Sequence, residues 1–121
     1  MAAPNILSAS SIYGKQHGVN LDTTLTTSLL ANAGSSDKLY KINTIIASNN
    51  HGSSSTSVTV NFNDGTRWTI ASTVTVPADS TLVILGKDSP IYLEECFTIE
   101  GGAASANMID LIIAYEILDD A

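Results

Sequence analysis

The chain has 121 residues and a formal net charge of −7, with only five basic side chains against twelve acidic ones. This length suits one domain with one hydrophobic core, and the shortage of Lys and Arg argues against a nucleic-acid partner, because basic side chains drive phosphate binding. Its apolar runs are far shorter than the roughly 20 residues of a membrane-spanning helix, so no membrane partner is expected.

The first twenty residues, MAAPNILSASSIYGKQHGVN, mix Gly, Ser and Asn with isolated apolar side chains. This pattern predicts an extended N-terminal arm over residues 1–20 and a single domain over residues 21–121. No basic residue precedes an apolar core, so no export signal is expected. The arm cannot form a core of its own, and another chain is expected to cover its apolar side chains. These candidate contacts are Ile6, Leu7, Ile12 and Tyr13.

Short strands are predicted next, at TTLTTSLLA (residues 23–31) and KLYKINTIIASNN (residues 38–50), which is rich in β-branched residues. A polar loop, SNNHGSSSTS, follows. In TSVTVNFNDGTRWTI, apolar and polar residues alternate on both sides of Asp64 and Gly65. This pattern predicts a β-hairpin with a type I′ turn, which needs positive φ at both central residues.

The second half of the chain continues the β pattern. STLVILG (residues 80–86) and SPIYLEECFTIE (residues 89–100) are predicted strands on either side of a turn, EGGAASAN is a predicted loop, and NMIDLIIAYEIL is a strand with period two. The whole pattern predicts an all-β fold, an antiparallel β-sandwich or jelly roll of about seven to eight strands. The side chains expected to face inward are Val58, Val60, Phe62, Ile109, Leu111, Ile113 and Tyr115.

Few residues in the sequence are candidates for catalysis. Glu94 and Glu95 are neighbours in a predicted strand and would point to opposite faces, so they would not flank one substrate. His17 and His51 are interpreted as exposed loop residues, because neither has a second ligand at a suitable spacing. Cys96 follows two acids, which disfavour a thiolate, and is predicted to be a buried or half-buried structural thiol. The chain is therefore not expected to be an enzyme or to hold a metal or cofactor.

Four blocks of the sequence, taken in order, resemble small virion proteins encoded by tailed bacteriophages, many of them marine or cyanobacterial: KLYKINTIIASNN, SVTVNF, VPADSTLVILGKDSPIYLEE and NMIDLIIAYEIL. The similarity covers roughly residues 21 to 118. It implies a β-sandwich structural protein, made in the host cytoplasm and assembled into the virion. The first expectation is a capsid decoration (cement) protein, bound as a homotrimer to the major capsid protein on the outer capsid surface.

Two alternatives stay open at the sequence level. The first is a neck, tail or fibre-associated virion protein, including a host-facing adhesive module, which would differ from a decoration protein in copy number. The second belongs to another class, a small hydrolase or a carbohydrate-binding accessory protein. Such a protein needs a concave site with convergent polar groups, and the sequence offers no such cluster.

Overall fold

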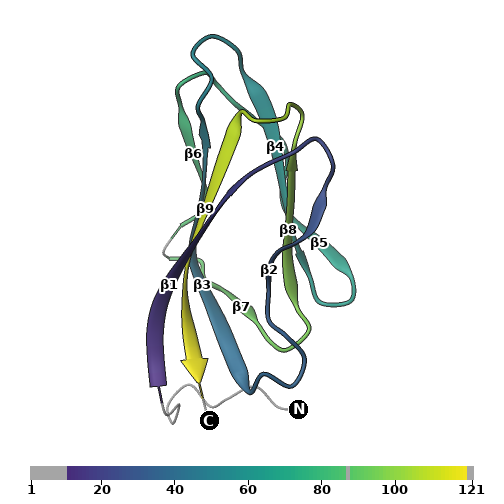
Figure 1. Ribbon diagram of the computed structural model, residues 1–121, viewed down its shortest axis with the longest axis vertical. Coiled ribbons are helices and arrows are strands. Elements are labelled where there is room, and N and C mark those ends of the chain that lie inside the picture. Colours follow the sequence, from purple (N-terminus) through teal and green to yellow (C-terminus); the bar gives the residue numbers. More distant parts are fainter. Residues whose placement is uncertain (1–10, 87, 120–121) are drawn as a thin grey trace.

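The computed structural model describes residues 11–86 and 88–119, and within them the chain forms nine strands and no helix. Two antiparallel sheets pack face to face (Figure 1), which confirms the predicted β-sandwich. The strands are β1 (Ser11–Asn20), β2 (Thr26–Ala31), β3 (Lys38–Asn49), β4 (Thr56–Asn63), β5 (Arg67–Val76), β6 (Thr81–Leu85), β7 (Ile91–Leu93), β8 (Thr98–Ala103) and β9 (Ile109–Asp119).

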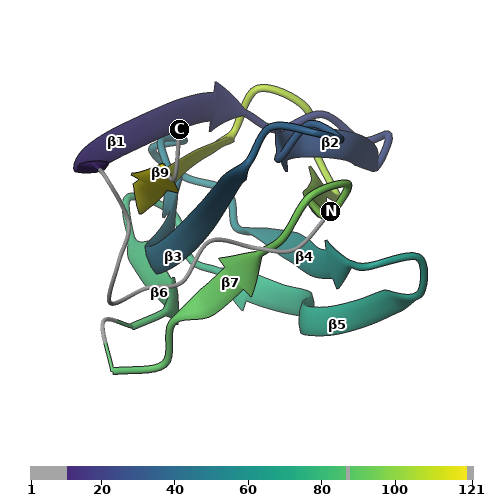
Figure 2. The same cartoon turned by 90° about the horizontal axis from the view of Figure 1, so that it is seen from below.

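The order of strands in the two sheets is that of a jelly roll. Sheet A runs β1-β9-β3-β6, with β7 also paired to β3, and sheet B runs β2-β8-β4-β5. The chain changes sheet at every connection except β4–β5 and β6–β7 (Figure 2). Because β6 and β7 pair with different parts of β3, they share one strand position. Counted in this way, each sheet has four strand positions, as in the eight-stranded jelly roll.

The core lies between the sheets and is formed by alternate residues of their central strands. Ile109, Leu111 and Ile113 of β9 are completely buried, and each such side chain contributes about 1.5–3 kcal/mol. Six of the seven residues expected to face inward are buried. The seventh, Phe62, is half-buried against the core, where its ring meets that of Phe97 edge-on with 5.7 Å between centroids.

Strand β3 carries one extra residue where it pairs with β9. The register shifts between Ile42 and Thr44, so Asn43 is inserted as a β-bulge. The bulge keeps Ile42 and Ile45 in the core on either side of it. The Asn43 side chain points outward, and its Nδ2 donates a hydrogen bond to Glu116 Oε1 at 3.0 Å.

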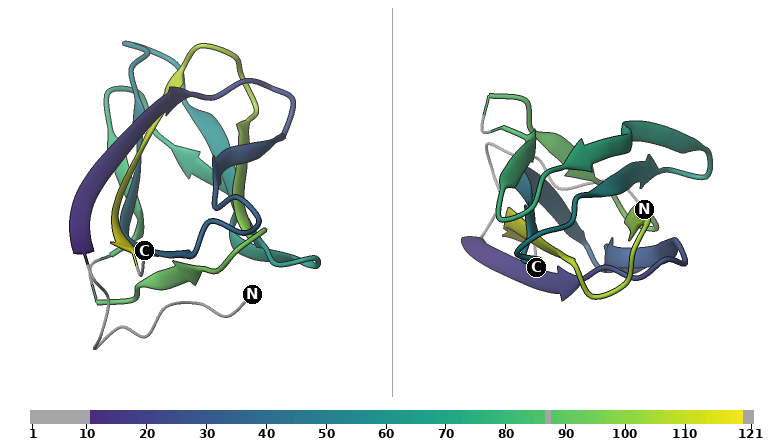
Figure 3. Two further views of the ribbon diagram at one scale, coloured as in Figure 1. Left: turned by 60° about the horizontal axis from the view of Figure 1, so that its bottom comes forward. Right: turned by 90° about the horizontal axis from the view of Figure 1, so that it is seen from above.

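Half of the predicted N-terminal arm is part of the sandwich, because residues 11–20 form β1 at the edge of sheet A (Figure 3). This strand pairs with β9 over ten consecutive positions. The sheet therefore begins before the boundary predicted at residue 20. The sequence did not indicate this strand, since Gly14, Gly18 and the polar residues beside them interrupt any apolar alternation. Ile6 and Leu7 lie outside the described residues.

The segment expected to form one strand over residues 89–100 is divided between the two sheets. It forms β7 in sheet A and β8 in sheet B, joined by a turn in which Cys96 has a φ of 70°. Strand β8 continues through Gly101 and Gly102, which were predicted to lie in a loop. A Cβ on Gly101 would lie 2.5 Å from Leu29 Cδ1, so close packing against the core explains this glycine.

The predicted β4–β5 hairpin forms, but its turn differs from the expected type I′. Asn63 pairs with Arg67, which leaves three residues in the loop. Only Gly65 has a positive φ, at 108°, and Asp64 does not. Two side chains support the backbone instead: Asn63 Oδ1 accepts the N–H of Gly65 at 2.8 Å, and Asp64 Oδ1 accepts the N–H of Thr66 at 3.1 Å.

Candidate functional site

The two described residues among the predicted contacts do not share a surface. Ile12 and Tyr13 are exposed, by 56% and 38%, but they are neighbours in β1 and point to opposite faces. Tyr13 pairs with core-facing Ile117, whereas Ile12 pairs with Leu118 on the outer face of sheet A. Ile12 therefore belongs to the outer face of sheet A, whereas Tyr13 lies on the opposite side of the edge strand.

The free edge of β1 is the least protected of the sheet edges in the described part of the chain. Strand β1 has ten residues in unbroken register and no proline. The other edges are interrupted: β2 and β5 contain register shifts, and the fourth position is split between β6 and β7. Bulges, prolines and short strands normally block unwanted pairing. Strand β1 has only the charge of Lys15 and is open to strand addition.

The outer face of sheet A carries most of the exposed apolar surface. Of the seven large apolar side chains that are exposed among the described residues, four lie on this face. Register places Ile112 beside Ile46, and Ile46 beside Val83, so an apolar row of these three residues crosses β9, β3 and β6. The four exposed side chains are Ile12, Val83, Tyr92 and Ile112.

A shallow hollow of about 500 Å³ lies on the same face. Its lining includes Gly14 and Gln16 of β1, Ala114 and Glu116 of β9, and Asn43 at the bulge. Small residues open the hollow, since a Cβ on Gly14 would have no atom within 4 Å. The Glu116 carboxylate in this lining already accepts a hydrogen bond from the Asn43 amide. The hollow is suited to receive a side chain of a binding partner.

The outer face of sheet B is polar, and it carries none of the seven exposed apolar side chains. Trp68 and Val74 belong to β5, but they pair with Phe62 and Val58, on the side of the sheet that faces the core. Thr59 and Thr73 line a second hollow of about 350 Å³ on the polar face. The two faces of the sandwich are therefore chemically different.

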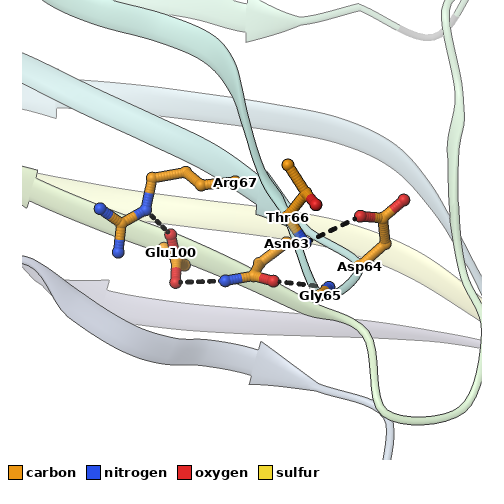
Figure 4. Close-up of polar contacts among 6 residues, drawn as sticks. All are labelled: Asn63, Asp64, Gly65, Thr66, Arg67 and Glu100. Atoms are coloured by element: carbon orange, nitrogen blue, oxygen red, sulfur yellow. Dashed lines mark hydrogen bonds and ion pairs between the residues drawn. The ribbon is translucent and has the colours of Figure 1, made fainter.

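A buried carboxylate on sheet B was missed at the sequence level. Glu100 lies on β8 with a side chain only 2% exposed, and Arg67 Nε donates to its Oε1 at 2.6 Å (Figure 4). Asn63 Nδ2 donates to its other oxygen at 3.1 Å. Burial raises the pKa of Glu100, but Arg67, Asn63 and Asn61 together outweigh it and hold the pKa below its usual 4.5. This carboxylate stays ionised and fully paired, so it ties β8 to the β4–β5 hairpin.

The other acidic candidates lie in a turn rather than in a strand. Glu94 is exposed, whereas Glu95 Oε2 accepts the backbone N–H of Asp37 at 2.9 Å. Cys96 is exposed and not buried as predicted, because its positive φ turns the chain at the surface. Its backbone N–H donates to the carbonyl of Asn32 at 2.8 Å. These residues hold two loops together and do not surround a common point.

The two histidines lie in different kinds of segment. His51 is an exposed loop residue, and its Nδ1 accepts the N–H groups of Ser53 and Ser54 at 3.2 and 3.0 Å. His17 lies on β1 and not in a loop. Across residues 11–86 and 88–119, no group of three His, Cys, Asp or Glu side chains is placed to hold a metal ion.

The described part of the chain also contains no helix long and apolar enough to cross a membrane. Comparison of the sequence with protein-family models gives no match, and comparison with curated protein sequences gives none either.

Proposed function

We propose that this protein is a structural component of a tailed-bacteriophage virion, a decoration protein that binds the major capsid protein on the outer capsid surface. The observation that carries the proposal is the open edge of β1, ten residues long and without a bulge. The resemblance of the sequence supplies the virion context. The jelly roll is compatible with it, because viral capsid domains use this architecture, although lectins and other proteins do so too.

Binding through the β1 edge requires no chemistry. About half of the N–H and C=O groups of an edge strand point away from its sheet and are available to a new strand. An extended segment of the capsid protein would pair with them and continue sheet A, with main-chain hydrogen bonds giving affinity and side chains giving specificity. A clamp of this kind stabilises a DNA-filled capsid by adding protein contact across the boundary between neighbouring capsomers. A stable contact needs on the order of 1,000 Å².

The test uses capsids that lack this protein and two single variants, Lys15→Pro and Gln16→Pro. Neighbouring N–H groups in a strand point in opposite directions. Lys15→Pro therefore removes a hydrogen bond to β9, whereas Gln16→Pro removes only an outward donor. We expect Gln16→Pro to keep the β spectrum and melting temperature of the parent and to bind capsids at least ~10-fold more weakly. Unchanged binding by that folded variant would contradict strand addition.

The copy number in purified virions separates the capsid from other positions. A decoration protein should reach the copy number of the major capsid protein or a fixed fraction of it, as measured by quantitative mass spectrometry. A copy number far below that level would assign the protein to the neck, tail or fibres.

A further inference from the structure

We propose that the outer face of sheet A is covered by a second copy of this chain, with the same face of both copies packed sheet on sheet. This contact is separate from the capsid contact, which uses the edge of β1, and it does not depend on the virion assignment. The face carries four of the seven exposed large apolar side chains, including Ile112 and Val83 of the apolar row. The end of the face beside Ile12 is already covered, because Leu39 and Leu118 are buried there, so the open part of the face is the apolar row and the positions next to it.

The distribution of charge favours a second copy over a charged partner. Two copies of a chain with a net charge of −7 repel each other unless their contact avoids acidic residues. The middle of the face is free of charge, because the apolar row is continued by Gly18 on β1 and the next positions are Gln16, Ala114 and Thr44. A charged partner would find no complementary group there, whereas an identical neutral surface meets no repulsion.

The acidic side chains that flank this neutral zone are already paired within the chain, and Lys41 lies beside Glu116 in the register of the sheet. Asp110 Oδ1 accepts the Asn20 amide at 2.9 Å, and its Oδ2 accepts the Asn50 amide at 3.0 Å. On the other side, Glu116 accepts the Asn43 amide. These carboxylates already accept hydrogen bonds within the chain, so they need no further donor from the facing copy.

The size of the face suits a small specific contact. Four strands about 4.8 Å apart and about 10 residues long span roughly 20 by 30 Å, so each copy can offer at most about 600 Å², and less where Leu39 and Leu118 are already buried. Two copies would bury at most roughly 1,200 Å², at the small end of the range for specific interfaces. The hollow beside Gly14 gives room for a side chain of the facing copy. A face that pairs with itself closes at two copies, so a dimer is expected and not the trimer that the resemblance implied.

The experiment measures the mass of the purified full-length protein in solution by light scattering and sedimentation equilibrium at tens of micromolar. Ile112→Lys and Val83→Lys each place a charge in the apolar row, and Gly14→Val fills the hollow. Thr75→Lys, on the outer face of sheet B opposite Ser57, is the matched control. We expect a dimer for the parent chain and the control, and a dissociation constant raised by roughly 100-fold for the two lysine variants.

Retention of fold is checked by circular dichroism, and Gly14→Val is the variant least expected to disturb the fold, because a Cβ at this position has no atom within 4 Å. A dimer weakened by this variant, with an unchanged β spectrum, supports the proposal. A monomeric or trimeric parent chain overturns it, as does a dimer that survives both lysine substitutions. A monomer whose lysine variants lose binding to undecorated capsids overturns it as well, and assigns the face to the capsid protein.

Discussion

Replacement of Arg67 by alanine removes the charged partner of a buried carboxylate. The Glu100 side chain is 2% exposed and lies 2.6 Å from Arg67 Nε. Loss of one partner of a buried pair costs about 3–5 kcal/mol. Since the Arg67 side chain is 51% exposed, water compensates for part of this loss, and Asn63 remains bonded to the carboxylate. We expect Arg67→Ala to lower the free energy of unfolding by about 2 kcal/mol at pH 7, and the melting temperature by about 8 °C.

The cost should depend on pH in a defined direction. The pKa of Glu100 is lowered in the folded protein from its usual 4.5, so the pair's contribution is complete above that unfolded-state value and is lost as the pH falls through the lower folded value. Without Arg67, burial raises the pKa of this carboxyl group, and protonation then relieves the unpaired charge. Urea unfolding at pH 7 and pH 4 should therefore show a smaller effect of Arg67→Ala at the lower pH.

The control is a double-mutant cycle with Glu100→Gln, which keeps the shape of the side chain and removes its charge. Arg67→Ala should cost much less in that background. If it costs the same with Gln as with Glu, or less than about 0.5 kcal/mol in the parent chain at pH 7, the ion pair is not what joins β8 to the hairpin.

Three further predictions concern backbone and packing. Gly101→Ala should destabilise the protein by about 1–3 kcal/mol in urea unfolding, because its Cβ would collide with a core leucine, whereas Gly18→Ala, in open space, should not destabilise it. Thr73→Gly should raise stability by about 0.5–1 kcal/mol, because a β-branched residue at a φ of 51° is strained, while Thr75→Gly should lower it; a loss of stability for Thr73→Gly would contradict the strain. A truncation that starts the chain at Leu21 should lower the soluble yield and the melting temperature sharply, because it uncovers β9; a melting temperature within a few degrees of the parent would show that β1 is dispensable.

The strands that the sequence predicted best are those whose alternate residues enter the core. In β9, Ile109, Leu111 and Ile113 are buried because they face sheet B, and the intervening residues are not fully buried. The same period marks Val58 and Val60 in β4. In these strands the alternation of buried and exposed residues can be read from neighbouring positions of the sequence. It could therefore be recognised without knowing the partner strands.

Features set by distant partners could not be predicted in this way. Strand β1 has no apolar alternation of its own, and it forms because its backbone pairs with that of β9. The turn at Cys96 depends on the carbonyl of Asn32, which is remote in the sequence. Glu100 was missed for the same reason, since its partner Arg67 is 33 positions away and reaches it only across adjacent strands.

One residue of the candidate surface was named from the sequence. Ile12 lies exposed on the outer face of sheet A, and its role as a partner contact stays a prediction. The apolar row could not be found from sequence, because Ile46, Val83 and Ile112 belong to three separate predicted strands. Only the sheet order and the register shifts in the pairings of β3 with β9 and with β6 bring them side by side.

The bulge at Asn43 gives this protein one position where its length can change at little cost. Without this residue, β3 would alternate regularly, and Ile42 and Ile45 would still face the core on either side of Thr44. Deletion of Ala47 would instead turn the rest of the strand over and expose its inward side chains. A chain one residue shorter at Asn43 is therefore compatible with the same jelly roll, and in an alignment of relatives a gap at this position would not indicate a different fold.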